Sequence, residues 1–219
     1  MKKFLLLAVV LFAVSCAADT YNSFNGYNPY WHPFGYPDTT TYGEIFTAPT
    51  SGSDFLMNFS LYLAGPYSSG EIILRAYLAT WTGTHAGTLL YSSDPVHYAN
   101  TGNAQLTFNT VAMLSPGQNY IAFISVSQDY GQSIGQSYAS AGNGGCPGCA
   151  FAYFNNGGDF NQLFTSDWNA YGLQPDFAFT AEFAEGCCST VPEPGTLALL
   201  VGGLAALARF GRRLMVNGR

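Results

Sequence analysis

The sequence predicts an all-β protein, an antiparallel jelly-roll-like β-sandwich flanked by an N-terminal signal peptide and a C-terminal transmembrane helix. Three observations support this prediction. Short runs of alternating apolar and polar residues are separated by turn-forming residues. Aromatic residues make up 16% of the chain and 25 residues are glycine, a mixture that favours strands and turns over helices. Uncharged apolar segments occur near both ends.

Residues 1–18 have the layout of a secretory signal peptide. Two lysines precede an unbroken apolar run at 4–14, and small residues follow at 15–18. The apolar run is too short for an ordinary membrane span. We therefore expect cleavage after one of the two alanines that end this segment. Lipidation is the alternative, because the residues ending at Cys16 resemble a bacterial lipobox.

Residues 19–190 correspond to one domain by their length. Period-two alternation places apolar residues on one face of a strand, which predicts a sandwich with an apolar interior. The expected strands are 44–47, 56–63, 71–81, 88–91, 105–109, 119–127 and 176–183, with a turn at 115–118. The expected inward-facing residues are Phe59, Leu61, Leu63, Phe177, Phe179, Ala181 and Phe183.

Two long stretches, 21–42 and 128–174, do not show the strand pattern. Both are rich in Gly, Asn and scattered aromatic residues. Loops of this length in a compact domain are binding elements or poorly ordered segments. We therefore expect a binding site to draw on these two stretches.

The C-terminal segment 191–219 contains an apolar helix followed by an arginine cluster. Residues 196–208 carry no charge. At about 1.5 Å per residue they reach roughly 20 Å, against about 30 Å for the hydrocarbon core of a bilayer. Extending the helix to about 195–210 gives a thin span. The positive-inside rule places the arginines on the cytoplasmic side, so the body of the chain is expected in the periplasm.

The motif before this helix resembles a known sorting signal. The residues concerned are Val191, Pro192, Glu193 and Pro194, with Arg209, Arg212 and Arg213 after the helix. Their order and position resemble the PEP-CTERM signal of exported proteins from Gram-negative bacteria that make exopolysaccharide. The resemblance implies recognition by an exosortase, a membrane transpeptidase that removes the helix. The protein would then pass from the inner membrane to the cell envelope or the outside.

The stretch 46–126 is also similar to ectodomains that often precede this signal. Those ectodomains are sandwiches that broadly resemble carbohydrate-binding modules. The resemblance supports the predicted fold and assigns no role to any single residue.

The expected domain is strongly acidic. Between residues 19 and 190, Arg75 is the only Lys or Arg and stands against twelve Asp and Glu, a formal charge of about −11. Such a surface repels phosphates and anionic lipid headgroups, which excludes nucleic acid and anionic membranes as partners. We expect no cofactor, although scattered carboxylates and carbonyls would suit Ca²⁺.

Four cysteines lie in the domain: Cys146, Cys149, Cys187 and Cys188. An even number in an exported chain predicts disulfides. We expect one of the two crossed connectivities, because the remaining one requires a strained bridge between two adjacent cysteines. A zinc site built from the four thiols and thioredoxin-like redox chemistry are the alternatives, although the spacing and the all-β context fit neither standard form.

The sequence contains no recognisable catalytic motif. Its three histidines, His32, His85 and His97, show no metal-binding spacing, and no nucleophile elbow accompanies them. We therefore predict an exported, non-catalytic protein of the envelope or matrix that binds exopolysaccharide. The alternative is a secreted glycan-acting hydrolase on the same scaffold, which requires two carboxylates about 5–10 Å apart in a cleft.

Aromatic residues in loops are the candidates for glycan binding, because sugar rings stack their apolar faces on exposed aromatic rings. An exposed aromatic cluster indicates a ligand surface. The alternative is that these rings only pack the loops onto the sandwich. The acidic surface favours a neutral or cation-bridged glycan. The candidates are Tyr30, Trp31, Phe34, Tyr36, Trp81 and Trp168.

Overall fold

The computed structural model describes residues 18–172 and 175–185, which belong to one compact unit spanning 17–186. Residues 1–17 of the expected signal peptide, the sorting motif, the transmembrane helix, Cys187 and Cys188 lie outside the described residues. Among the residues that are described, no helix is long and apolar enough to cross a membrane.

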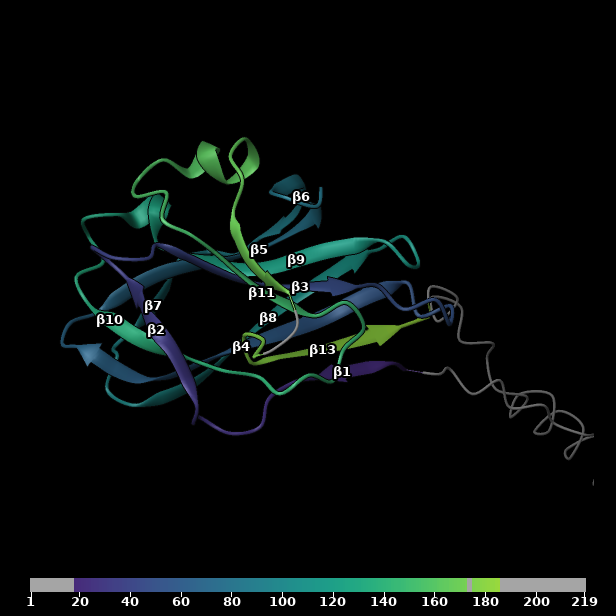
Figure 1. The fold of residues 1–219 in the computed structure, drawn as a ribbon, viewed down its shortest axis with the longest axis horizontal. Helices are drawn as coiled ribbons and strands as arrows, with labels where there is room; N and C mark the ends of the chain where they lie inside the picture. Colours follow the sequence, from purple (N-terminus) through teal and green to yellow (C-terminus); the bar gives the residue numbers. More distant parts are fainter. Residues whose placement is uncertain (1–17, 173–174, 186–219) are drawn as a thin grey trace, which may run out of the picture. The chain divides into compact units, whose positions relative to one another are not determined.

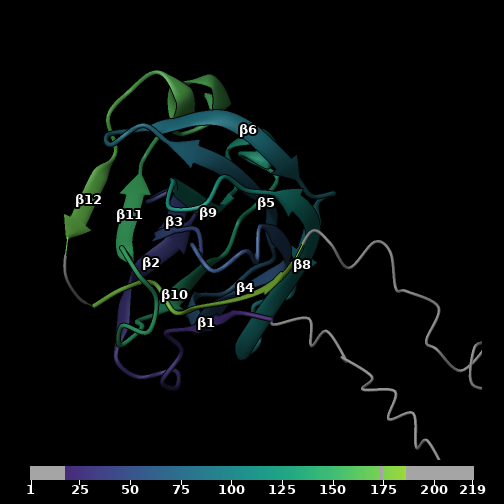
Figure 2. The ribbon, with the colours of Figure 1, turned by 90° about the vertical axis from the view of Figure 1, so that its right-hand side faces the viewer.

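Two antiparallel sheets form a sandwich, as the alternation predicts (Figures 1 and 2). Sheet A has six strands in the order β1-β13-β4-β10-β2, with β8 paired to β4. Sheet B has seven in the order β12-β11-β3-β9-β5-β6, with β7 paired to β5. The strands of sheet A are β1 (Thr20–Asn22), β2 (Tyr30–Gly35), β4 (Phe55–Ser68), β8 (Asn103–Met113), β10 (Gln136–Ser140) and β13 (Phe179–Ala184). The strands of sheet B are β3 (Thr41–Thr47), β5 (Ile72–Trp81), β6 (Ala86–Ser92), β7 (Val96–Tyr98), β9 (Asn119–Ser125), β11 (Ala150–Phe154) and β12 (Asn169–Gly172).

Each expected strand has a counterpart in the structure. Strands β3, β4 and β8 extend beyond the expected ends, and β13 begins three residues later than expected, at Phe179. The expected turn is also present, since the N–H of Gln118 donates to the carbonyl of Ser115 at 3.2 Å. The prediction of an antiparallel β-sandwich is confirmed.

The two long stretches expected to be loops contain five further strands, so that expectation was wrong. Strand β2 lies in the first stretch, and β10, β11 and β12 lie in the second; β1 overlaps the start of the first. These strands are three to six residues long, and β2 and β12 stand at the ends of their sheets. Apart from β12, which pairs with β11 about 20 residues earlier, each of them has a partner distant in the sequence, so pairing rather than local alternation creates them. Strand β11, for example, pairs with β3 about 109 residues earlier, Phe151 opposite Glu44 and Ala152 opposite Gly43.

The main core lies between the two sheets. The inward-facing residues expected from the alternation, including Phe59, Leu61 and Phe177, are fully buried there. Full burial of one such side chain contributes about 1.5–3 kcal/mol to folding. The alternation in the sequence therefore reports the interior face correctly.

A second, smaller core lies on the other face of sheet B. It joins residues of β3, β5 and β9 to the 3-10 helix η2 (Phe160–Phe164) and the residues around it. Trp168 is a central member, with 6% of its surface exposed, and its indole N–H donates to the carbonyl of Leu163 at 2.9 Å. The segment that was expected to be a loop thus covers this face of the sheet, which accounts for several of its aromatic residues.

The loop before β11 carries a disulfide between Cys146 and Cys149, with Cα atoms 5.5 Å apart. This pairing contradicts the crossed connectivities that we expected. The physical reason is a tight turn, in which the N–H of Cys149 donates to the carbonyl of Cys146 at 3.4 Å. The turn is docked on β3, since the N–H of Thr47 donates to the carbonyl of Pro147 at 2.9 Å.

Candidate functional site

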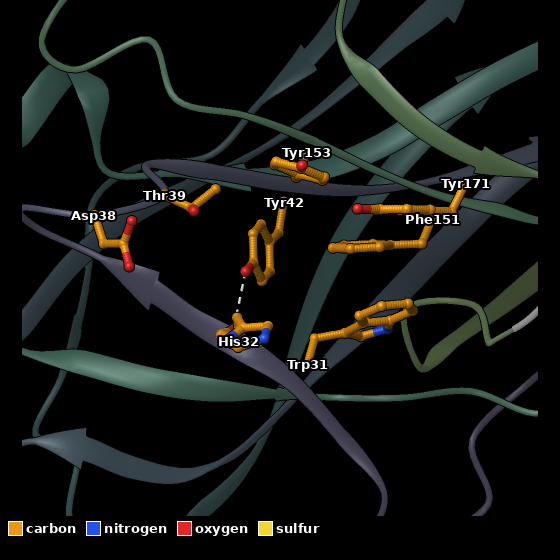
Figure 3. A pocket seen from close by; sticks show the side chains of 8 residues that line it. All are labelled: Trp31, His32, Asp38, Thr39, Tyr42, Phe151, Tyr153 and Tyr171. Atoms are coloured by element: carbon orange, nitrogen blue, oxygen red, sulfur yellow. Dashed lines mark hydrogen bonds between the residues drawn. The ribbon is translucent and has the colours of Figure 1, made fainter.

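An aromatic pocket opens where the edge strands of the two sheets face each other (Figure 3). Its volume is about 290 Å³. Strand β2 contributes from sheet A, and β3, β11 and β12 contribute from sheet B. The lining residues are Trp31, His32, Asp38, Thr39, Tyr42, Phe151, Tyr153 and Tyr171.

Strand geometry explains how the rings of sheet B reach this pocket together. Side chains two residues apart in a strand point to the same face, which places Phe151 and Tyr153 side by side on β11. In the antiparallel pairing, Tyr171 of β12 lies opposite Phe151, and Tyr42 of β3 lies opposite Tyr153. Cross-strand partners have neighbouring side chains on one face of the sheet. Three strands therefore deliver four rings to one place.

Most of these rings are nearly parallel to one another. Trp31 stacks on Phe151 with centroids 4.5 Å apart and planes at 22°. Tyr171 lies 5.7 Å from Trp31 at 20°, and 5.8 Å from Tyr153 at 18°. Phe151 is buried, Trp31 and Tyr153 are half-buried, and Tyr171 is 49% exposed. Phe151 thus fixes the stack to the core, while the other three rings are partly accessible to solvent.

Polar groups surround the stack. Tyr42 stands perpendicular to Phe151, and its hydroxyl donates to the backbone carbonyl of His32 at 2.9 Å. Burial raises the pKa of Tyr42 well above its usual value, so this hydroxyl stays protonated and keeps its donor role. The pKa of Tyr153 is raised chiefly by its hydrogen bond with Tyr171 and further by burial. His32 and Asp38 are exposed at the rim.

The structure places the glycan-binding candidates in different environments. Trp31 lies in the pocket, whereas Trp168 and Phe34 are buried, so the expectation of exposed rings at these two positions was wrong. Trp81 is half-buried against Trp168, with centroids 6.0 Å apart. Tyr36 is half-buried against Tyr130, with centroids 4.9 Å apart, and neither is among the residues that line the pocket.

Sequence reasoning missed Tyr42, Phe151, Tyr153 and Tyr171 as members of this site. The alternating run Ala150–Phe154, AFAYF, was a usable signal, because it spaces Phe151 and Tyr153 for one face of a strand. No local signal marks Tyr171, which follows Trp168 by three residues and yet lies on another face.

Two buried carboxylates, Glu44 and Asp176, lie next to the pocket residues. They are 0% and 1% exposed. Glu44 neighbours Phe151 across the β3–β11 pair, and the backbone carbonyl of Asp176 accepts a hydrogen bond from the indole of Trp31 at 3.0 Å. Burial raises the pKa of Glu44, and the charge of Asp176 raises it further, while the N–H of Phe177 opposes the shift. Burial also raises the pKa of Asp176, partly offset by the N–H of Gly144.

The histidines do not converge on one site. His32 is at the rim of the pocket, whereas His85 lies 3.7 Å from Asp167 and His97 lies 3.2 Å from Glu71. His85 and Asp167 lie in loops, whereas His97 is in β7 and Glu71 immediately precedes β5.

Comparison with known proteins identifies the C-terminal segment. Residues 190–213 match the PEP-CTERM protein-sorting motif, as the resemblance predicted. The chain therefore carries the signal of an exported protein that is held at the membrane before an exosortase processes it. The match is confined to this segment and says nothing of the sandwich.

One solved structure shows a remote likeness to the chain. The cysteine protease and lectin-like domains of Cwp84, a surface layer associated protein of Clostridium difficile, align at 12% identity with a TM-score of 0.41. The alignment covers 77% of this chain and 36% of that one, so the chain spans about a third of its length. This likeness is too low to bear on function. No curated protein matches the chain.

Proposed function

We propose that the domain is a non-catalytic module of the cell envelope or extracellular matrix that binds exopolysaccharide in the aromatic pocket. The observation that carries the proposal is the parallel stack of Trp31, Tyr153 and Tyr171 at the junction of the two sheet edges. The sorting motif supports it, because export and exosortase processing bring the domain to the place where the polysaccharide accumulates.

The chemistry of the pocket suits a sugar chain. Pyranose rings have apolar C–H faces that pack on aromatic rings, while their hydroxyls bond to tyrosine hydroxyls and to the carboxylate of Asp38 at the rim. An exposed aromatic patch of this kind costs free energy in water unless a ligand covers it. The formal charge of about −11 in residues 19–190 disfavours an anionic polymer. We therefore infer a neutral polysaccharide, or an anionic one bridged by a divalent cation such as Ca²⁺.

The same geometry favours binding over hydrolysis. A glycosidase of the common type needs two carboxylates facing its substrate. The lining of the aromatic pocket includes one, Asp38, whereas Glu44 and Asp176 are enclosed by protein. The proposal thus assigns the pocket to recognition, with the body of the chain in the periplasm before processing.

The test compares two tyrosines of similar exposure. Tyr171 is 49% exposed in the pocket, and Tyr30 is 51% exposed and packs on Tyr138 outside the pocket lining. Processed protein would be titrated against the producer's own exopolysaccharide. We expect Tyr171→Ala to weaken binding about tenfold, which corresponds to about 1.4 kcal/mol, and Tyr30→Ala to bind as wild type. Equal affinity of Tyr171→Ala and wild type, or no binding by wild type, would overturn the proposal.

A further inference from the structure

A buried side chain of the main core has an unused ligand atom. Glu44 lies on β3 with its side chain between the sheets, on the same face as Tyr42 and Phe46. One carboxylate oxygen, Oε2, accepts the N–H of Phe177 at 2.8 Å. The other, Oε1, has no hydrogen-bond partner among the described residues. A buried polar atom without a partner is destabilising, so its presence calls for a physical explanation.

The sulfur atoms of Cys146 and Cys149 lie beside this carboxylate. One carboxylate oxygen of Glu44 and the two sulfurs all lie within 4.8 Å of one another. The turn that carries the cysteines is held in place, because Thr47 donates to the carbonyl of Pro147 at 2.9 Å. It also has no room for a larger residue at Gly148, where a Cβ atom would overlap Oγ1 of Thr47. The three groups are therefore positioned by the fold.

We propose that Glu44, Cys146 and Cys149 form a site for a thiophilic divalent cation of the zinc type, available when the two sulfurs are not joined to each other. Two thiolates and a carboxylate are ligands that zinc prefers. Typical Zn–S and Zn–O lengths, about 2.3 Å and 2.0–2.2 Å, put tetrahedral ligand atoms roughly 3.5–3.8 Å apart. To reach that spacing, the two sulfurs must move apart once the disulfide is broken, while the carboxylate oxygen, which lies within 4.8 Å of both, has at most about 1 Å to close.

The proposed site explains the unpaired oxygen. A cation bound through Oε1 of Glu44 would give that atom a partner and would offset negative charge in a segment where Arg75 is the only Lys or Arg among residues 19–190. Three protein ligands leave a fourth position for water, as in open zinc sites. The metal would link the turn to Glu44 of β3, whereas the disulfide links only the two cysteines of the turn to each other.

The disulfide and the metal exclude each other, because both use the same sulfurs. A dithiol reductant opens the disulfide: the Cys146–Cys149 bond breaks, two electrons and two protons convert it to two thiols, and the dithiol becomes a disulfide. Binding of the cation then releases one proton from each thiol, together with the proton of Glu44 where its carboxyl carries one, so that two thiolates and a carboxylate hold the metal. A newly exported chain reaches the same state directly, since its cysteines are made as thiols.

The test uses Co²⁺ as a spectroscopic probe of the full chain, with Cys16, Cys187 and Cys188 replaced by serine to remove other thiols. After reduction and removal of the reductant, we expect one Co²⁺ per chain, with thiolate-to-cobalt absorption in the near ultraviolet that Zn²⁺ abolishes. Protein with the Cys146–Cys149 disulfide intact should show none. The absence of this absorption from the reduced chain would overturn the proposal.

Two variants separate the site from adventitious thiol binding. Glu44→Gln preserves the shape of the side chain and is expected to weaken Co²⁺ binding by at least about tenfold. Losses of about 10–100-fold are seen even for residues that only support metal ligands. Glu182→Gln removes an exposed carboxylate and should bind as the parent chain does. Thermal unfolding would establish that Glu44→Gln is folded. Unchanged affinity in the folded Glu44→Gln variant would show that Glu44 is not a ligand and would refute the site.

Discussion

The indole N–H of Trp31 donates a hydrogen bond to the backbone carbonyl oxygen of Asp176, 3.0 Å away and 145 residues later in the chain. The same carbonyl accepts the N–H of Gly142 at 2.7 Å, and Oδ2 of Asp176 accepts the N–H of Gly144 at 2.9 Å. Asp176 therefore contacts both the aromatic pocket, through Trp31, and the chain just before the disulfide turn, through Gly142 and Gly144. A ligand that displaces Trp31 would break its hydrogen bond to Asp176 and so perturb this segment as well.

Trp168 is predicted to stabilise the fold without contributing to the pocket. Its ring packs against Phe123 and Trp81 in the second, smaller core, with centroids 5.3 Å and 6.0 Å away. Trp168→Ala should lower the free energy of unfolding by about 3–5 kcal/mol, because it leaves a large cavity. Tyr171→Ala, at a half-exposed position where the ring stacks on Trp31 and Tyr153, should lower it by less, about 0.5–1.5 kcal/mol. Urea denaturation measures both changes in the free energy of unfolding. A small decrease for Trp168→Ala would contradict the burial of Trp168 in the second, smaller core.

The polysaccharide affinity of Trp168→Ala gives a second check on the same variant. At a temperature where the variant is still folded, its affinity should equal that of wild type. A loss of polysaccharide binding without a loss of stability would show that the binding site includes Trp168 in the second, smaller core and not the aromatic pocket alone.

Stability should fall as the pH rises above the usual pKa of Asp176. Burial raises the pKa of Asp176 from 3.8, so the folded protein holds this proton more tightly than the unfolded chain does. Between 3.8 and the higher folded pKa, the free energy of unfolding therefore falls with pH, by at most about 1.4 kcal/mol per pH unit for one proton. Well below pH 3.8, Asp176 is protonated in both the folded and the unfolded chain, so it no longer makes the free energy of unfolding depend on pH.

Asp176→Asn tests this dependence. Urea midpoints would be measured from pH 4 upward on oxidised protein in the presence of a chelator. The urea midpoint of Asp176→Asn should decrease less with rising pH than that of wild type. Asp94→Asn, at an exposed position, should follow the wild-type curve. Parallel curves for Asp176→Asn and wild type would contradict the buried carboxylate.

Processing of the C-terminal segment should depend on Glu193. In a host with its exosortase, the wild-type protein is expected to lose the apolar helix and the arginines and to leave the inner membrane. Replacement of Glu193 by Ala should leave the full-length form in that membrane, because the altered residue lies in the matched sorting motif. Mass spectrometry of fractionated cells distinguishes the forms. An intact tail on mature wild-type protein would refute this assignment.

Native protein should resist trypsin between residues 19 and 190. Arg75 is the only Lys or Arg there, it lies within β5, and its Nε donates to Oδ2 of Asp129 at 3.0 Å. Cleavage requires local unfolding of a strand that is paired on both sides, which is rare in a stable sheet. Protein unfolded in urea and reduced should be cut at Arg75. Rapid native cleavage there would show that β5 opens readily.

The sequence determined the features that depend on neighbouring residues. The alternation in 56–63 and 176–183 predicted strands with Phe59, Leu61, Phe177 and Phe179 inside, because a strand's side chains point to opposite faces in turn. The sorting motif was equally readable, since its parts are contiguous and in fixed order. The same alternation placed Glu44 on the face of Tyr42 and Phe46, a signal that was available and overlooked.

Only the tertiary structure decided which aromatic rings form a site. Trp168 and Tyr171 lie three residues apart, yet one is buried on the outer face of sheet B and the other is exposed beside Trp31. The structure also decided that Cys146 pairs with Cys149, in a tight turn that docks on β3, where the count of cysteines left the connectivity open. The placement of the rings depends on pairings such as that of β11 with β3, about 100 residues earlier, and the free energy of such contacts is a property of the assembled sheets rather than of any segment of the sequence.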